Sequence, residues 1–381
     1  MKVSVIADDF TGANDIGIQL KKYGLKVITK TYDSKISIKS DVEIISTESR
    51  NIDKKKAYER VKKSFMELKN SEKFFKKIDS TLRGNIKEEL KAIQENINKQ
   101  EKILVIVGFP NTNRKIINGK HYIKDIPLHL TEFKNDPYFP IKTNDLLEYF
   151  EGEIIKINDI RSNRQEKLKE KIKSIKSQII IFDTENNNDL DIIAKTIIEL
   201  KLDKYIVGSS GIMEYLMKYW GYKRPQIAII SGSCNAKNIE QIKVLESNNN
   251  IEVIDVDFTK KNIDIEKKKY KNDILIRSIK NIRDYNKAKE NYKVVEITDI
   301  FTDISKKIIE ENNIKNLIIS GGEISINILK KMSIDYLEVI KEIEPGIAYL
   351  KYKEYNIITK PGGFGSEKFY KKAYEFMKSF R

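Results

Sequence analysis

Two adjacent carboxylates follow the first apolar segment of the chain. Asp8 and Asp9 come directly after Val3–Ala7, which is rich in β-branched residues, and before a segment with helical periodicity. In open parallel sheets, ligands bind at the carboxyl ends of the strands. Two acids there can divide the chemistry, one accepting a proton from a substrate hydroxyl and the other holding that hydroxyl or a metal ion. The alternative is a helix N-cap, for which one carboxylate would suffice.

A second group of charged and polar residues follows the apolar segment Phe74–Ile78. Its residues Lys77, Asp79, Ser80 and Arg83 lie in one turn that could bind a polyhydroxy acid. Asp79 is expected to accept hydrogen bonds from hydroxyls, while Lys77 and Arg83 attract negative charge beside the N-terminus of the next helix. A capped helix start is the alternative, but it does not require two cations and an acid in one turn.

Arg50 follows the apolar segment Val42–Ser46, and its planar guanidinium suits a carboxylate or phosphate bound through two hydrogen bonds. Taken alone, it is equally consistent with a surface arginine. Residues 108–137 then read as a long loop, a class of segment that is often functional. His121 in this loop is expected to be a structural hydrogen-bonding residue.

Glycine-rich turns follow three apolar segments of the second half. They are Ser231–Asn235, Ser320–Glu323 and Lys360–Gly365. Glycine lets backbone amides approach a phosphate without interference from a Cβ, so three such turns favour a phosphate-binding site. Neither a P-loop nor a Gly-x-Gly-x-x-Gly fingerprint is present, which argues against a Walker NTPase and a dinucleotide dehydrogenase. No histidine lies near Cys234 in the sequence, so it is not assigned as a nucleophile.

Alternating strands and helices must position these residues. The expected strands are Val3–Ala7, Lys26–Thr29, Val42–Ser46, Phe74–Ile78, Ile103–Val107, Ile154–Ile157, Gln178–Phe182, Lys204–Val207, Ile227–Ile230, Glu252–Val256, Asp273–Arg277, Asn316–Ile319, Gly346–Tyr352 and Tyr355–Thr359. The expected helices are Gly12–Lys22, Asp53–Lys69, Asn85–Asn98, Leu190–Leu200, Gly211–Trp220, Lys237–Glu246, Ile304–Asn312 and Ile324–Met332. This alternation predicts an α/β protein with mostly parallel sheets flanked by helices. Gly and Pro within 219–225 place a boundary between domains 1–220 and 226–381.

Composition limits the function classes. The 381 residues are 40% hydrophobic and 33% charged, which suits a globular protein. No segment reaches membrane-spanning length and no signal peptide is visible, so a cytoplasmic protein without membrane partners is expected. One cysteine and two histidines argue against a zinc site. The net charge is +15, but only ten of the 71 basic residues are Arg and the lysines are spread evenly, so nucleic acid is not an expected partner. The oligomeric state stays open, with a homodimer as the candidate assembly.

Five motifs together resemble the four-carbon acid sugar kinases. They are Ala7–Ala13, Lys77–Gly84, Ser231–Ser233, Ser320–Glu323 and Lys360–Gly365, in the family's order and spanning nearly the whole chain. The resemblance implies an N-terminal domain for the acid sugar, a C-terminal domain for ATP, and an active site in the cleft between them. It also implies substrates such as threonate, erythronate or 3-oxo-tetronate.

The resemblance carries roles to individual residues. Asp8, Arg50 and the turn Lys77–Ser80 are similar to the family's sugar-acid contacts. The residues similar to its nucleotide contacts are Ser231, Gly321, Gly322, Glu323, Ile324, Gly362 and Gly363. This chain departs from the family pattern at Pro361 and Gly363, which replace Ser and Asn, and at Ile324, which replaces Thr. These changes remove hydrogen-bonding side chains but leave the glycine-lined backbone cradle of the turns.

The sequence therefore predicts an ATP-dependent kinase that phosphorylates a hydroxyl of a four-carbon sugar acid. Asp8 or Asp79 is the candidate general base, Asp9, Arg50 and the turn up to Arg83 bind the substrate, and the glycine turns hold ATP with Mg²⁺. Residues that bind the metal are not assigned. The alternatives are a kinase for another small hydroxy acid or polyol, and a non-catalytic sensor of a sugar acid or nucleotide.

Overall fold

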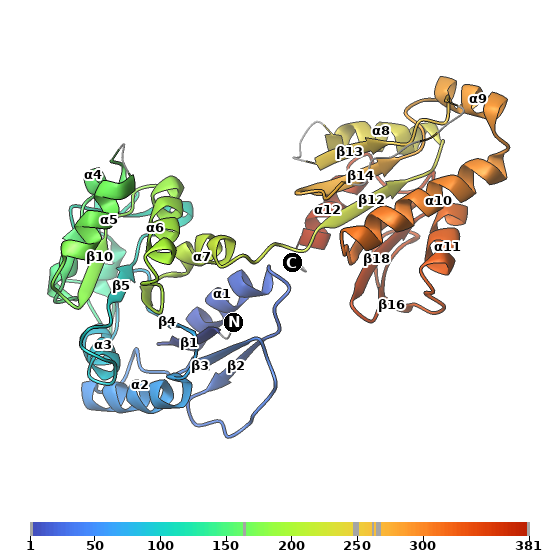
Figure 1. The fold of residues 1–381 in the computed structure, drawn as a ribbon. Helices are drawn as coiled ribbons and strands as arrows, with labels where there is room; N and C mark the ends of the chain where they lie inside the picture. Colours follow the sequence, from blue (N-terminus) through green and yellow to red (C-terminus); the bar gives the residue numbers. More distant parts are fainter. Residues whose placement is uncertain (1–2, 163–164, 247–250, 261–262, 264–267, 379–381) are drawn as a thin grey trace. The chain divides into compact units, whose positions relative to one another are not determined.

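The computed structural model describes residues 3–162, 165–246, 251–260, 263 and 268–378. The chain forms two compact units, Met1–Lys223 and Arg224–Arg381 (Figure 1). Each unit is built around its own sheet with helices on both faces. Part of the lysine-dense stretch 260–271, expected to be an exposed loop or helix face, lies outside the described residues.

The first unit contains an eight-stranded sheet in which all neighbouring strands are parallel. In spatial order the strands are β2 (Val27–Thr31), β3 (Val42–Ser46), β1 (Val3–Ala7), β4 (Lys73–Lys77), β11 (Tyr205–Gly208), β5 (Ile103–Ile106), β10 (Ile179–Phe182) and β9 (Glu153–Ile155). Ala7 is in register with Ser46 of β3 and with Lys77 of β4. The turns that follow these three strands therefore leave the sheet at the same level.

Helices cover both faces of this sheet because each presents an apolar stripe to it. One face is covered by α1 (Phe10–Lys21), α4 (Ile157–Ile160), α5 (Gln165–Ser174), α6 (Asn187–Glu199) and α7 (Met213–Tyr219). The other is covered by α2 (Lys54–Leu68) and α3 (Ile86–Gln94). On α2, Ala57, Val61 and Phe65 recur every fourth residue and are all buried, and Asp53 caps the first turn.

The expectation of a long loop over residues 108–137 is wrong. This stretch forms a three-stranded antiparallel sheet of β6 (Arg114–Ile117), β7 (Lys120–Ile123) and β8 (Ile126–Pro127). Asn118 and Gly119 connect β6 to β7 with φ of 51° and 71°, the left-handed conformation that a two-residue hairpin turn requires. The Asn-Gly pair was thus the sequence signal for this hairpin.

The second unit contains a seven-stranded sheet that is parallel except at one edge. In spatial order its strands are β13 (Ile251–Asp255), β14 (Asp273–Arg277), β12 (Ile227–Ser231), β15 (Asn316–Ser320), β18 (Tyr355–Lys360), β17 (Ile347–Tyr352) and β16 (Glu338–Glu344). The pairs β17–β18 and β16–β17 are antiparallel. The predicted fold class, two α/β domains with mostly parallel sheets flanked by helices, is confirmed.

Five helices flank this second sheet within the described residues. One face packs against α9 (Ile282–Asn291), α10 (Val294–Glu311) and α11 (Gly322–Lys331), and the other against α8 (Ala236–Glu246) and α12 (Phe369–Lys378). The helix expected from Ile304 begins ten residues earlier, because Ile297 and Phe301 extend the buried stripe of α10. The sequence analysis did not anticipate α9, α12 or β16.

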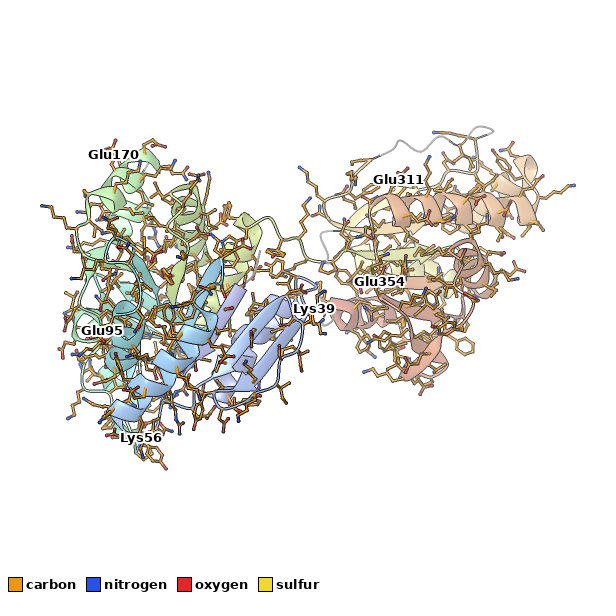
Figure 2. All side chains as sticks on the ribbon, turned by 60° about the horizontal axis from the view of Figure 1, so that its bottom comes forward. Lys39, Lys56, Glu95, Glu170, Glu311 and Glu354 are labelled. Carbon is orange, nitrogen blue, oxygen red and sulfur yellow. The ribbon has the colours of Figure 1, made fainter. Side chains whose placement is uncertain are left out.

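Charged side chains of both signs are distributed over both units. Figure 2 labels six of them, all exposed: Lys39, Lys56, Glu95, Glu170, Glu311 and Glu354. Ion pairs such as Lys30–Glu67 and Lys218–Asp191 intersperse acids among the lysines. Within the described ranges, no helix has both the length and the apolar character needed to cross a membrane.

Candidate functional site

Asp8, Asp9 and Arg50 form one cluster at the carboxyl ends of β1 and β3. Arg50 Nε donates to Asp8 Oδ2 at 2.7 Å, and an Arg50 terminal nitrogen donates to Asp9 Oδ1 at 2.9 Å. The charges of these acids raise the pKa of Arg50 against the opposing effect of burial, so the guanidinium stays charged. Asp8 is 2% exposed, and its Oδ1 is buried with no hydrogen-bond partner among the described residues.

The two acids of the pair have different local roles. Asp9 is the N-cap of α1, and its Oδ1 accepts a hydrogen bond from Gly12 N at 2.8 Å. Burial raises the pKa of Asp9, while the charge of Arg50 opposes this effect. A Cβ at Gly12 would lie 2.5 Å from Asp9 Oδ1 and 3.2 Å from Lys77 Nζ, so a larger residue would have to displace the ends of these two side chains. The capping alternative therefore applies to Asp9 and leaves Asp8 without a capping role.

The turn after β4 is organised around Asp79. Its Oδ2 accepts hydrogen bonds from Arg83 Nε and Thr81 Oγ1, both at 2.6 Å. Burial alone would raise the pKa of Asp79, but the hydrogen bond from Arg83, the charge of Arg50 and the hydrogen bond from Thr81 lower it to about 2. Arg83 also donates to Asp136 at 3.1 Å, which ties the turn to the segment after the small sheet.

Lys77, Ile78 and Ser80 contribute to this edge in different ways. Lys77 Nζ donates to the Ile78 carbonyl at 3.1 Å and lies 3.8 Å from Asp15 Oδ2. The Ile78 side chain belongs to the core, so only its backbone is available to a ligand. The Ser80 carbonyl lies 2.8 Å from His121 Nε2, and burial lowers the pKa of His121 to about 4. A neutral imidazole bound to a backbone oxygen fits the structural role expected for His121.

A buried ion pair that sequence reasoning missed lies behind the Asp8 cluster. Lys76 Nζ and Glu89 Oε2 are 2.7 Å apart, and both side chains are 1% exposed. Ser49 Oγ donates to Glu89 Oε1 at 2.5 Å, and the Ser49 amide donates to the Asp8 carbonyl at 2.9 Å. Glu89 is thereby linked to the segment that carries Arg50. The signal in the sequence was a lysine that alternates with Phe74 and Ile78, on the side of the strand that faces the core, where a charge requires a partner.

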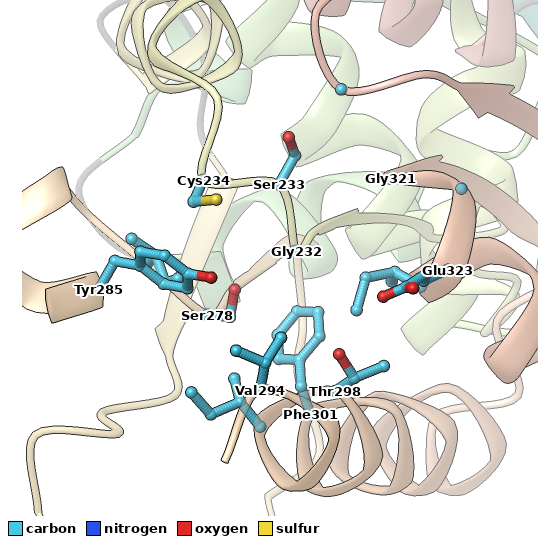
Figure 3. Close-up of a pocket in the computed structure, with 15 residues that line it drawn as sticks. Gly232, Ser233, Cys234, Ser278, Tyr285, Val294, Thr298, Phe301, Gly321 and Glu323 are labelled. Carbon is cyan, nitrogen blue, oxygen red and sulfur yellow. The ribbon is translucent and has the colours of Figure 1, made fainter. Parts of the chain in front are cut away.

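The glycine turns of the second unit surround a cavity of about 310 Å³. Figure 3 shows Val294, Thr298 and Phe301 rising from α10 toward the turn at Gly232, with Tyr285 on one side and Glu323 on the other. The lining residues are Gly232, Ser233, Cys234, Ser278, Ile279, Tyr285, Val294, Ile297, Thr298, Phe301, Gly321, Gly322, Glu323, Ile324 and Gly362. One wall is apolar and the other is formed by turns rich in backbone amides.

Five of the seven candidate nucleotide contacts line this cavity: Gly321, Gly322, Glu323, Ile324 and Gly362. Ser231 is buried below it, where its Oγ accepts from Asn238 Nδ2 at 2.9 Å. Gly363 is exposed beside Asn235 and is not a lining residue. Sequence reasoning missed the apolar wall from α9 and α10, because Tyr285 and Phe301 follow no motif.

One buried amide, Asn238 on α8, joins the three glycine turns. Its Oδ1 accepts hydrogen bonds from Ser320 Oγ at 2.8 Å, Lys360 Nζ at 3.2 Å and Tyr370 OH at 2.6 Å. Its Nδ2 donates to the Ser233 carbonyl at 3.1 Å as well as to Ser231. Ser231, Ser320 and Lys360 each end a strand, so one side chain fixes the spacing of all three turns.

Neither unit presents a preformed metal centre among the residues that the structure describes. No group of three His, Cys, Asp or Glu side chains is placed to hold a metal ion there. Mg²⁺ in proteins is usually held by one or two carboxylates together with ligand phosphates rather than by a cage of side chains. Glu323 is the carboxylate that lines the cavity.

Comparison with known protein families matches each unit separately. A family described as a sugar-binding N-terminal domain matches residues 3–216, and one described as a nucleotide-binding C-terminal domain matches residues 228–370. The two matched ranges fall within the two compact units of the fold.

Two named kinases match nearly the whole chain and a third matches about two thirds of it. A D-threonate kinase from Salmonella typhimurium is 26% identical over 96% of this chain and 96% of its own length. A 3-oxo-tetronate kinase from Haemophilus influenzae is 24% identical over 97% of this chain and 98% of its own length. A D-erythronate kinase from Heliobacterium modesticaldum is 26% identical over 64% of this chain and 60% of its own length.

Solved structures share the fold. A Bordetella bronchiseptica protein, crystallised with bound citrate as a domain-swapped dimer, gives a TM-score of 0.64 at 17% identity and covers 100% of this chain and 98% of its own. A Haemophilus influenzae protein gives a TM-score of 0.53 at 22% identity, over 98% of this chain and 100% of its own. Both similarities extend over the two units together.

Proposed function

This chain belongs to the four-carbon acid sugar kinase family and is a phosphotransferase with an alcohol acceptor, and we propose that it transfers the γ-phosphoryl group of ATP to a hydroxyl of a four-carbon sugar acid. The family matches and the named kinases support the reaction class. The substrate class follows from these names, which are threonate, erythronate and 3-oxo-tetronate kinases.

The sugar acid is proposed to bind at the carboxyl edge of the first sheet. A four-carbon sugar acid offers one carboxylate and several hydroxyls, so it needs cations and hydrogen-bond acceptors within a few ångströms of one another. Arg50, Lys77 and Arg83 supply the positive charge there, and Asp8, Asp9 and Asp79 supply the acceptors. Charge-assisted hydrogen bonds of this kind fix orientation as well as affinity.

Asp8 is proposed as the general base, and the observation that carries this choice is its unpartnered oxygen. Arg50 occupies Oδ2 and fixes the carboxylate, whereas Oδ1 is buried without a hydrogen bond among the described residues. Such an orphan acceptor is rare in folded proteins and is satisfied when a hydroxyl donates to it. The proton passes from the hydroxyl to Asp8, the hydroxyl oxygen bonds to the γ-phosphorus, and ADP leaves with the electrons of the broken bond.

Asp79 is the weaker candidate for the base. Its Oδ2 already accepts hydrogen bonds from Thr81 and Arg83, and these interactions hold its pKa at about 2. A carboxylate stabilised this strongly is a poor proton acceptor, because catalytic efficiency is greatest when the pKa lies near the working pH. Asp79 is better suited to orienting Arg83 and accepting a substrate hydroxyl.

ATP is proposed to bind in the cavity of the second unit. The apolar wall of Tyr285, Val294 and Phe301 suits a nucleotide base, and the turns at Gly232, Gly321 and Gly362 present amides to phosphates. Mg²⁺ commonly uses one or two carboxylates besides phosphate oxygens, and Glu323 fits this need. When bound, the ion neutralises charge that develops on the phosphate oxygens during transfer.

A substrate screen tests the proposal. The protein with MgATP is assayed for ADP formation with each stereoisomer of threonate, erythronate and 3-oxo-tetronate, and at least one should stimulate it. A sugar-acid or nucleotide sensor would bind its ligand without producing ADP. A kinase for another small polyol or hydroxy acid would turn over those compounds and none of the tetronates.

A further inference from the structure

The ammonium group of Lys360 is buried at the end of β18 without a counter-ion. The residue is 1% exposed, and none of the described carboxylates forms an ion pair with its Nζ. Its hydrogen bonds go to three uncharged oxygens, the Gly362 carbonyl at 2.7 Å, the Pro361 carbonyl at 3.3 Å and Asn238 Oδ1 at 3.2 Å. Buried charges are normally paired, so this arrangement requires an explanation.

The other two buried lysines of the described residues show the usual solution, a carboxylate near the ammonium. Lys76 is also 1% exposed, but Glu89 lies 2.7 Å from its Nζ. Lys77 is 4% exposed and its Nζ lies 3.8 Å from Asp15 Oδ2. Burial and the neighbouring charge of Lys237 lower the pKa of Lys360 to about 8, because no carboxylate beside it favours the charged form. A positive charge held directly behind a glycine turn has an obvious complement, which is a phosphate anion bound on the other side of that turn.

The hydrogen bonds of Lys360 also determine the shape of the turn. Because Nζ draws the carbonyls of Pro361 and Gly362 toward itself, these oxygens point away from the ligand side of the turn. Asn238 holds Nζ in place through Oδ1, which is in turn fixed by Ser320 and Tyr370. A lining residue, Gly362, thus depends directly on the position of the ammonium.

We propose that Lys360, anchored by Asn238, is a charged positioning residue for the nucleotide phosphates, holding the 361–363 turn in its binding conformation and supplying the positive charge behind it. This inference rests on the proposed ATP site. Lys360 does not line the cavity, and it acts on the phosphates through the Gly362 carbonyl and through the electric field of its ammonium group.

The neighbours of Lys360 allow its titration to be measured separately from theirs. Lys237 on α8 is the other charged group that acts on it, and Tyr370 on α12 is the titratable group in contact with the same Asn238 oxygen. Burial raises the pKa of Tyr370, so this phenol stays neutral while Lys360 titrates. The rings of Phe369 and Tyr370 lie 5.8 and 5.7 Å from Nζ and complete the pocket.

The sign of the pH effect follows from linkage. In the free protein Lys360 loses its proton as the pH rises through about 8. Phosphates favour the charged form and raise this pKa, so nucleotide binding above that pH must take up a proton. Affinity therefore decreases as the pH rises, by up to about tenfold per pH unit in this range.

Calorimetric titration with MgADP tests the inference. Binding to the intact wild-type protein is measured at about pH 8.5, in two buffers of different ionisation enthalpy, because histidine and carboxylates are already deprotonated there. We expect uptake of a large fraction of a proton. Lys360→Met keeps an aliphatic side chain against the two rings but has no group that titrates. In this variant we expect no proton uptake and at least about tenfold weaker binding, which corresponds to about 1.4 kcal/mol.

Lys371→Met is the matched control. This exposed lysine on α12 carries the same charge change outside the turn, and the variant should keep the wild-type proton uptake. Uptake by Lys360→Met equal to that of the wild type would overturn the inference. So would wild-type binding without any uptake, a result that does not depend on the folding of a variant. Failure of the wild type to bind MgADP or MgATP at any pH would instead overturn the proposed nucleotide site, and the inference with it.

Discussion

The carboxyl edge of the first sheet carries charged side chains in close pairs, whereas that of the second carries glycine turns backed by Lys360, for which the described residues supply no counter-ion. In the first unit, Arg50 bridges Asp8 and Asp9, and Arg83 binds Asp79. In the second unit, the cavity is bounded by the turns at Gly232, Gly321 and Gly362. The same sheet architecture thus presents side chains at one edge and backbone at the other.

This difference matches the two ligands that we propose for the two edges. A small polyhydroxy acid is distinguished by where its charge and hydroxyls lie, which side chains can match one by one. A chain of phosphates is more uniform and is bound well by amides that converge on it. Removing side-chain charge should therefore damage the first edge, and adding a Cβ should damage the second.

The largest expected effect is on Asp8. Asp8→Asn removes the proton acceptor and should reduce kcat by about a thousandfold, within the range of general base catalysis, while the Kd for MgADP is unchanged. Asp9→Asn is the matched variant, because asparagine caps a helix as well as aspartate does. Its kcat should decrease less than that of Asp8→Asn. Steady-state kinetics with calorimetry separates the two. Near-normal turnover by Asp8→Asn would remove it from the mechanism.

Arg50→Lys should weaken sugar-acid binding next. Lysine cannot reproduce the two separate hydrogen bonds that Arg50 makes to Asp8 and Asp9. Hydrogen bonds to charged groups contribute about 1.5–3 kcal/mol, so KM for the acid should rise by about tenfold or more. The Kd for MgADP should stay constant. An unchanged KM would show that the first edge does not bind the acid through this cluster.

Asp79→Asn should reduce stability in a pH-dependent way. Because the folded-state pKa of Asp79 is lowered from 3.8 to about 2, its ionised form stabilises the fold at all pH values above about 4. The variant should lose about 2 kcal/mol of unfolding free energy at neutral pH, and the difference should vanish as the pH falls toward 2. Denaturant unfolding at several pH values measures it. Asp125→Asn, which breaks an exposed pair with Lys115, should show no such difference.

The smallest expected effect comes from a methyl group at the second edge. A Cβ at Gly232 would lie 2.4 Å from Ile324 Cγ1 and 3.1 Å from Phe301 Cε1, so Gly232→Ala must push side chains into the cavity. We expect about tenfold weaker MgADP binding, or about 1.4 kcal/mol, with KM for the acid unchanged. At Gly322 an added Cβ meets no atom within 4 Å, so Gly322→Ala should lose less affinity for MgADP than Gly232→Ala. Equal losses would contradict the steric account.

The sequence predicted the regular parts of the fold because periodic burial is a local signal. The strands Val3–Ala7, Val42–Ser46 and Asp273–Arg277 have the expected bounds. The small sheet was missed because its strands are short and mostly polar on one side, although Asn118–Gly119 marked its turn. The helix α9 was missed because its residues are mostly charged or polar and its buried stripe is thin.

Candidate site residues on motifs could be chosen from the sequence, but the residues that support them could not. Asp8, Asp79 and Gly362 belong to recognisable turns at strand ends. Lys76 with Glu89, and Lys360 with Asn238, come together only through tertiary packing, across 13 and 122 positions respectively. A lysine within a buried strand indicates that some partner exists, but the identity of the partner depends on which helix covers that face.

The most direct test of the central claim is the mass of the product. The intact protein is incubated with MgATP and each tetronate, and the mixture is analysed by mass spectrometry, with Asp8→Asn as the control. The account predicts one tetronate that gains a single phosphoryl group in step with ADP formation, and little product from the variant. Confirmed nucleotide binding without any phosphorylated tetronate, or product formed equally by Asp8→Asn, would contradict it.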